Sequence, residues 1–172
     1  MAIIALALAA AVQSASAAPA PPPAPPKVDC TDADHRAFDF WIGEWDVSPT
    51  GGTTVVARSK IEKIVGCAIS ETFDQNVGPG GKAIDYHGRS ISSYVPVENA
   101  WRQFYLDNSG TAASLTGGVV NGAMVLSNTI PIGMNRMTVT PNADGSVRQE
   151  GAFSGDGGKT WTPGYDFTYR KR

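Results

Sequence analysis

Two histidines, His35 and His87, are the side chains that could act as general bases near neutral pH. A catalytic triad needs such a histidine within reach of a nucleophile and an acid. Ser154 does not fit the G-x-S-x-G nucleophile elbow, because position 152 is alanine rather than glycine. We expect His35 on the exposed side of a short helix and His87 at the start of a strand, with no partner motif beside either. The sequence therefore predicts no catalytic residues; it leaves enzymatic activity open and favours a protein that is not an enzyme.

Metal and phosphate ligands follow no recognisable pattern either. Asp32, Asp34 and Asp39 lie close together but lack EF-hand spacing, and charge near a helix start explains them better. The glycine-rich segment 78–82 is not followed by the helix that a phosphate-binding loop requires. A net charge of −2 without a basic stripe argues against nucleic acid and against an anionic membrane surface. We predict no metal, no cofactor and no nucleic-acid partner.

Charged residues inside otherwise apolar segments are the remaining candidates for chemistry. They are Arg58, Glu71, Arg89, Arg102, Arg136 and Arg148. Strand residues alternate between two faces, so most of these side chains should meet water and one or two should point inward. An inward arginine needs an acid such as Glu71, or an anionic ligand.

Two aromatic residues, Trp101 and Tyr105, share one face of their expected strand and could line a binding cup; ordinary core packing is the alternative. The predicted ligand-binding set is therefore Glu71, Arg89, Trp101, Tyr105 and Arg136. The facing of each strand stays open, since a slip of one residue inverts it.

The amino-terminal segment has the features of an export signal. An uninterrupted apolar run at residues 3–12 is followed by Ala15-Ser16-Ala17, an A-x-A cleavage pattern. The run is shorter than the ~20 residues that span a bilayer, so we predict no membrane span. Residues 1–17 are the predicted signal peptide, cleaved near Ala17, and the Pro/Ala-rich residues 18–29 form an extended linker. The mature protein is expected in the periplasm or outside the cell.

Two cysteines, Cys30 and Cys67, follow this export signal. An even count in an oxidising compartment favours a disulfide, and the chain lacks the C-x-x-C or Cys/His spacing of a redox or metal site. In the chain-entropy model, closing this loop contributes roughly 3–4 kcal/mol to stability.

The elements that would position all these residues are mostly strands. Apolar, β-branched runs alternate with glycine-, asparagine- and proline-rich turns every ~8–12 residues. Asn121-Gly122 is the clearest hairpin signal. The runs predict about ten strands: 44–48, 53–65, 67–73, 88–95, 101–106, 112–120, 123–128, 135–140, 146–153 and 160–170.

Short connections between these strands favour an up-and-down antiparallel order, and closure into a barrel removes the two free edges. One short helix is expected at residues 34–42, because Phe38, Trp41 and Ile42 follow i, i+3, i+4 spacing. The predicted fold is thus an all-β, up-and-down antiparallel barrel over residues 30–172, with one short N-terminal helix.

Residues 38–47 read F-D-F-W-I-G-E-W-D-V and resemble the opening motif of a family of exported bacterial proteins of unknown function. That family is expected to form a calycin-like, lipocalin-like barrel. Gly43-Glu44-Trp45 is similar to the lipocalin G-x-W motif. The resemblance implies that Trp45 packs at the base of the barrel and that Arg170 stacks on it. Similar haem-binding barrels use a histidine near the C-terminus, which this sequence lacks, so the resemblance does not extend to haem.

A second motif, at residues 154–161, matches the Asp-box S-x-D-x-G-x-T-W. In sialidase-like proteins this box is a hairpin turn whose Asp and Ser side chains bind turn amides. The resemblance implies structural roles for Asp156 and Trp161.

The fold favours non-catalytic binding of a small hydrophobic or amphipathic molecule inside the barrel. Two alternatives remain: an enzyme that uses a buried carboxylate–arginine pair, and an interaction module with a filled barrel. The sequence specifies neither the ligand nor the oligomeric state.

Overall fold

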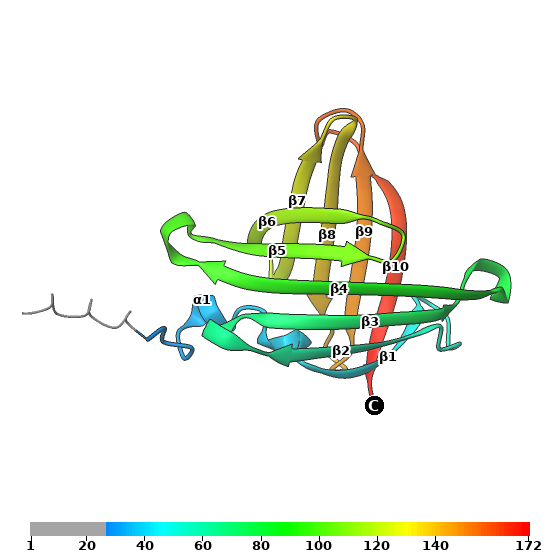
Figure 1. The fold of residues 1–172 in the computed structure, drawn as a ribbon, viewed down its shortest axis with the longest axis horizontal. Coiled ribbons are helices and arrows are strands. Elements are labelled where there is room, and N and C mark those ends of the chain that lie inside the picture. Colours follow the sequence, from blue (N-terminus) through cyan, green and yellow to red (C-terminus); the bar gives the residue numbers. More distant parts are fainter. Residues whose placement is uncertain (1–26) are drawn as a thin grey trace, which may run out of the picture.

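Ten antiparallel strands account for most of the chain between residues 43 and 171 in the computed structural model (Figure 1). The structure describes residues 27–172, so the predicted signal peptide (1–17) and most of the predicted linker (18–29) lie outside the described residues. The strands are β1 (Gly43–Pro49), β2 (Ala57–Lys63), β3 (Ile69–Val77), β4 (Ala83–Val95), β5 (Ala100–Asp107), β6 (Ala112–Val120), β7 (Ala123–Ile130), β8 (Gly133–Pro141), β9 (Val147–Ser154) and β10 (Thr162–Lys171).

Each strand pairs with its neighbours in the sequence, and β1 pairs with both β2 and β10. The sheet is therefore a closed up-and-down barrel, and this prediction is confirmed. Asn121 and Gly122 make the turn between β6 and β7 with φ angles of 51° and 82°. Positive φ at both central residues is what a tight hairpin turn requires, and the Asn-Gly pair tolerates it.

Three strand boundaries differ from the sequence prediction by four or five residues: the start of β2, the end of β3 and the start of β4. β2 begins at Ala57 rather than residue 53, because the ladder with β1 ends where Val47 pairs with Ala57. β4 begins at Ala83 rather than residue 88, because the β3–β4 hairpin continues through Gln75 paired with Tyr86. The missed extension contains polar and charged residues, which do not show a strand's apolar alternation.

The expected helix at residues 34–42 is wrong in its extent. The segment forms a four-residue α1 (Ala33–Arg36) and a separate 3₁₀ turn, η1 (Asp39–Trp41), divided at Phe38, whose ψ of 7° interrupts the α-helix. The break allows the Phe38 and Trp41 rings to stack, with centroids 5.0 Å apart, beneath the end of the barrel. Within residues 27–172, no helix has the length and apolar character needed to cross a lipid bilayer.

The end of the barrel next to α1 is filled by side chains. Phe38, Trp41, Trp45 and Tyr169 are fully buried there, and the Trp45 indole donates to the Trp41 carbonyl at 2.9 Å. The prediction that Arg170 stacks on Trp45 is wrong by one residue. Trp45 pairs with Lys171 across β1 and β10, and the ammonium of Lys171 lies 5.4 Å from the indole centroid. Because strand residues alternate, Arg170 pairs with Asp46 instead and faces outward.

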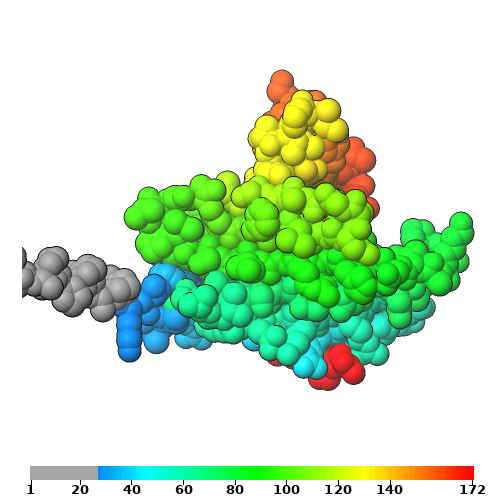
Figure 2. Space-filling model, viewed as in Figure 1, coloured from blue at the N-terminus to red at the C-terminus, as the bar shows by residue number. Residues whose placement is uncertain are grey.

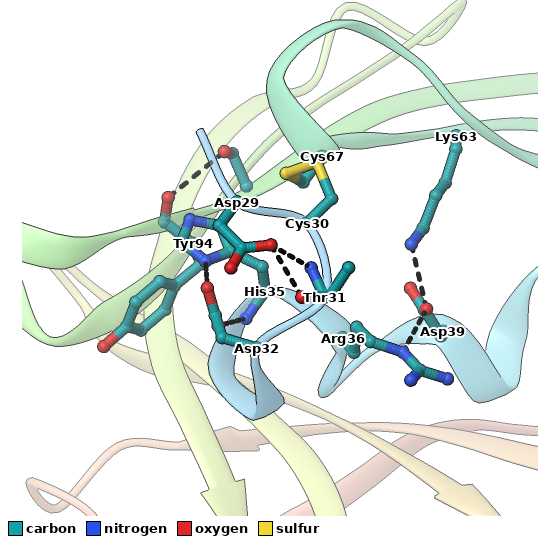
Figure 3. The surroundings of a disulfide bond; sticks show 11 residues. Asp29, Cys30, Thr31, Asp32, His35, Arg36, Asp39, Lys63, Cys67 and Tyr94 are labelled. Carbon is teal, nitrogen blue, oxygen red and sulfur yellow. Dashed lines mark hydrogen bonds and ion pairs between the residues drawn. A yellow bond between two sulfur atoms is a disulfide. The ribbon is translucent and has the colours of Figure 1, made fainter. Parts of the chain in front are cut away.

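The Cys30–Cys67 disulfide joins the N-terminal segment to the 3₁₀ turn η2 (Val65–Cys67) between β2 and β3 (Figure 3). The predicted pairing is confirmed, with the two Cα atoms 5.4 Å apart. Beside it, the ammonium of Lys63 at the end of β2 lies 2.9 Å from the Asp39 carboxylate. The bond and this ion pair together fasten the capping segment over one end of the barrel.

At the opposite end of the barrel, the one helical element within residues 27–172 is the 3₁₀ turn η3 (Pro79–Gly81), in the β3–β4 connection. The β3–β4 connection and the tip of β7–β8 project from the body of the molecule on either side of a concave surface (Figure 2). Successive strands of an up-and-down barrel place these turns at the same end, away from α1. The molecule thus has a closed, core-filled half and an open half.

Candidate functional site

A cavity of about 540 Å³ occupies the open half of the barrel. This volume lies within the range of small-molecule sites, roughly 300–1,000 Å³. The cavity is lined by Glu71, Phe73, Gln75, Tyr86, Gln103, Tyr105, Asp107, Thr111, Ala113, Leu115, Asn128, Asn135, Arg136, Met137, Gln149, Gly151, Ala152, Phe153, Gly164, Tyr165 and Phe167. The barrel is therefore not filled with side chains from end to end.

Glu71 lies where the cavity meets the packed core, and only 7% of its surface is exposed. Its carboxylate accepts hydrogen bonds from Ser59 at 3.1 Å and from Ser90 at 3.3 Å. The Tyr169 hydroxyl lies 3.5 Å away. Ser59 and Ser90 come from β2 and β4, the two strands that pair with β3, whereas Tyr169 comes from β10 and reaches Glu71 because the barrel is closed.

Burial raises the pKa of Glu71 to about 7, because removing a carboxylate from water disfavours its charged form. The hydrogen bonds from Ser59, Ser90 and Tyr169 oppose this rise without cancelling it. Within residues 27–172, no Lys, Arg or His nitrogen lies within 4.0 Å of the Glu71 carboxylate. The acid is solvated by hydroxyl groups and not by a cation.

The polar groups around Glu71 form the floor of the cavity, and two glutamines, Gln103 and Gln149, extend it. Tyr169 donates to the side-chain oxygen of Gln149 at 2.7 Å, the shorter of its two contacts, so its single proton is directed mainly to Gln149. On the other side, the amide of Gln103 donates to Ser92 at 3.1 Å. Both glutamines line the cavity.

A second polar cluster lies nearer the open end. The hydroxyls of Tyr86 and Tyr105 contact each other and both reach the Asp107 carboxylate, at 3.0 and 3.2 Å. Although burial raises the pKa of Asp107, hydrogen bonds from Ser109, the Thr111 amide and Tyr86 outweigh it and hold the pKa below its usual value. Asp107 is therefore ionised at neutral pH.

Aromatic rings form much of the wall between these two clusters. The Phe167 ring stacks on Tyr165, with centroids 5.8 Å apart, and contacts Phe73 at 6.1 Å. Glycine makes room for these rings: a Cβ at Gly151 would lie 2.2 Å from the Tyr165 ring. The cavity therefore presents flat apolar surfaces with acids at two depths.

The β9–β10 turn at the rim is held by its own side chains. Asp156 accepts hydrogen bonds from the Lys159 amide at 3.0 Å and the Thr160 amide at 2.9 Å, and Ser154 accepts from the Gly158 amide at 2.8 Å. The bonds from Thr160 are the main reason that the pKa of Asp156 falls to about 2.

Trp161 follows this turn, and its ring lies 4.0 Å from the guanidinium carbon of Arg136. The positive charge of Arg136 therefore interacts with the face of the Trp161 ring. Arg136 borders the cavity, but its side chain belongs to the outer face of β8. Its neighbours along the strand, Asn135 and Met137, belong to the inner face.

Of the five residues predicted to bind a ligand, Glu71, Tyr105 and Arg136 line the cavity. Trp101 faces the barrel interior, but in the closed half, where its indole donates to the Asp34 carbonyl. Arg89 lies on the outer face and pairs with Asp74 at 2.9 Å. The reason is register: Glu71 pairs with Ser90, so the residue before Ser90 points the other way.

The other three charged candidates are also on the outer surface. Arg58 pairs with Asp46, Arg102 with Glu98, and Arg148 with Asp166. Several cavity residues were not predicted: Tyr86, Gln103, Asp107, Gln149, Tyr165 and Phe167. Gln103 and Asp107 could have been found, because they share the period-two face of Tyr105 along β5.

The histidines make no catalytic constellation. His35 is 8% exposed, so its predicted exposure is wrong; it packs edge-on against Tyr94 and bonds to the Asp32 carboxylate at 2.6 Å. His87 lies on the outer face of β4 beside Asp74, whose hydrogen bond raises the pKa of the imidazole. Within the part of the chain that the structure describes, no cluster of three His, Cys, Asp or Glu residues could hold a metal ion.

The fold and the cavity together define a cup-shaped barrel with one closed end and one open end. Neither the known protein-family models nor the curated proteins contain a match to this chain.

Proposed function

We propose that this protein is an exported, calycin-like binding protein that holds a small molecule with a large apolar part in the open half of its barrel. The observation that carries the proposal is the cavity of about 540 Å³, whose walls combine aromatic and aliphatic side chains with polar groups such as Gln103, Gln149 and Asp107. A disulfide persists in an oxidising compartment, which supports a location in the periplasm or outside the cell.

A second candidate is acid–base chemistry at Glu71, which the raised pKa of about 7 favours, because perturbed acids in cavities are typical of active sites. The carboxylate–arginine pair that this alternative required is not formed by the candidate arginines. Arg89 is outside the barrel and Arg136 lies over Trp161. Binding is therefore the better supported function.

Occupancy of the cavity is testable with a neutral fluorescent probe, N-phenyl-1-naphthylamine. Ala113→Trp places an indole inside the cavity, whereas Ser114→Trp adds the same group one residue later on the exposed face of β6. We expect saturable fluorescence enhancement with the native protein and Ser114→Trp, and its loss in Ala113→Trp. Equal binding by the two variants, or no binding by the native protein, would overturn the proposal.

The natural ligand is sought by native mass spectrometry of the protein purified from its own periplasm, followed by organic extraction. A captured molecule that returns unchanged after incubation with the native protein supports binding. Conversion that Glu71→Gln abolishes would establish the enzymatic alternative.

A further inference from the structure

The charges around the cavity are predominantly negative. Its lining contains two carboxylates, Glu71 at the floor and Asp107 near the mouth, and one arginine. The guanidinium of that arginine, Arg136, lies over the Trp161 ring. An anionic ligand in this cavity would face two acids, and losing its hydration there would be costly.

The floor of the cavity gives the Glu71 carboxylate fewer and longer hydrogen bonds than a charged acid needs. Glu71 accepts two hydroxyl hydrogen bonds longer than 3.0 Å, and Tyr169 gives its shorter contact to Gln149. Hydrogen bonds of this length are weaker than the charge-assisted contacts near 2.8 Å that a paired carboxylate makes. The carboxylate therefore retains capacity for a cationic donor that enters from the cavity.

The aromatic walls of the cavity can accommodate a ligand that carries such a cationic donor. The faces of aromatic rings carry partial negative charge and attract ammonium groups within about 6 Å. Phe73, Tyr86, Tyr105, Tyr165 and Phe167 surround the space between the floor and the mouth. The side-chain oxygen of Gln149 adds a neutral acceptor beside Glu71.

We propose that the ligand is a protonated organic amine with an aryl or alkyl body, its ammonium group hydrogen-bonded to the Glu71 carboxylate at the floor of the barrel. This inference rests on the proposed binding function and specifies the chemical class of the ligand. The apolar body lies against the aromatic wall, and Asp107 near the mouth favours the entry of a cation.

Three probes with one common body test the inference: 4-phenylbutylamine, 4-phenylbutan-1-ol and 4-phenylbutanoate. Isothermal titration calorimetry with the mature protein at pH 8.5 should show the amine binding at least about tenfold more tightly than the alcohol, and the carboxylate most weakly.

Lowering the pH to 5.5 should weaken amine binding by about 30-fold while leaving alcohol binding nearly unchanged. Protons then compete for Glu71, whose pKa is about 7, whereas an alkyl amine stays protonated at both values. Other groups facing Glu71 do not titrate in this range. Burial raises the pKa of Tyr169 and of Tyr105 above the usual 10, Ser59 and Ser90 are neutral, and Asp107 remains ionised.

Glu71→Gln should abolish both the preference for the amine and its pH dependence, while Glu62→Gln, on the exposed face of β2, should preserve them. If Glu71→Gln does not fold, as judged by circular dichroism, the pH profile of the native protein decides. Equal affinity for amine and alcohol, or tightest binding of the carboxylate, would overturn this inference and leave the binding function intact. No binding of any probe would overturn both.

Discussion

The buried acid at the floor of the cavity should make the ligand-free protein less stable at high pH, and Glu71→Gln should remove this penalty. The folded-state pKa of about 7 lies above the ordinary value of 4.5. As pH rises, the unfolded chain therefore releases this proton first, and the free energy of unfolding falls between about pH 4.5 and pH 7. Above pH 7 the penalty is complete.

The magnitude follows from the difference between these two pKa values. Each pKa unit corresponds to about 1.4 kcal/mol, so the full penalty is about 3 kcal/mol, of which roughly 2–3 kcal/mol develops between pH 5 and pH 8.5. This is a large fraction of the stability of a typical domain. Glutamine is close in shape and can still accept a hydrogen bond from Ser59 or Ser90.

Urea unfolding of the native protein and Glu71→Gln at pH 5 and pH 8.5 measures the effect. Groups that titrate in both proteins cancel in the difference between them. We expect the variant to gain roughly 2–3 kcal/mol relative to the native protein across this range, and Glu62→Gln to gain nothing. Stability curves that stay parallel with pH would show that Glu71 titrates as an ordinary glutamate and would refute the account of its burial.

Three further predictions concern the elements that shape the barrel. Replacing Cys30 and Cys67 by serine should lower the free energy of unfolding, measured in urea melts, by roughly 3–4 kcal/mol. A reductant should then have no further effect on the variant. A loss smaller than about 1 kcal/mol would contradict the stabilising role of the disulfide. Asp156→Ala removes the acceptor for two turn amides and should lower the thermal midpoint of unfolding, whereas an unchanged midpoint would show that water replaces the carboxylate. Gly151→Ala should displace the Tyr165 ring and weaken binding of the neutral probe by at least severalfold; unchanged affinity would mean that the ring is not part of the wall.

The sequence alone was sufficient for the architecture. Turn residues such as Asn121-Gly122 divide the chain into short strands, and short connections permit only antiparallel neighbours, so the ten-stranded barrel was predictable. The two cysteines beyond a predicted export signal were sufficient to predict their pairing. These features depend on local residue type and spacing, which a sequence shows directly.

The cavity was only partly predictable, because it depends on register. Glu71 and Tyr105 were selected as candidates and line the cavity, but the same reasoning selected Arg89, which a one-residue offset places outside. Trp101 shares the interior face with Tyr105 and still misses the cavity, because depth along the barrel axis separates the packed half from the open half. Ser59 and Ser90 reach Glu71 from the two strands that pair directly with β3, but their facing depends on register. Tertiary structure alone decided that Tyr169 also lies beside Glu71, since β10 is distant in sequence and comes close to β3 only when the barrel closes.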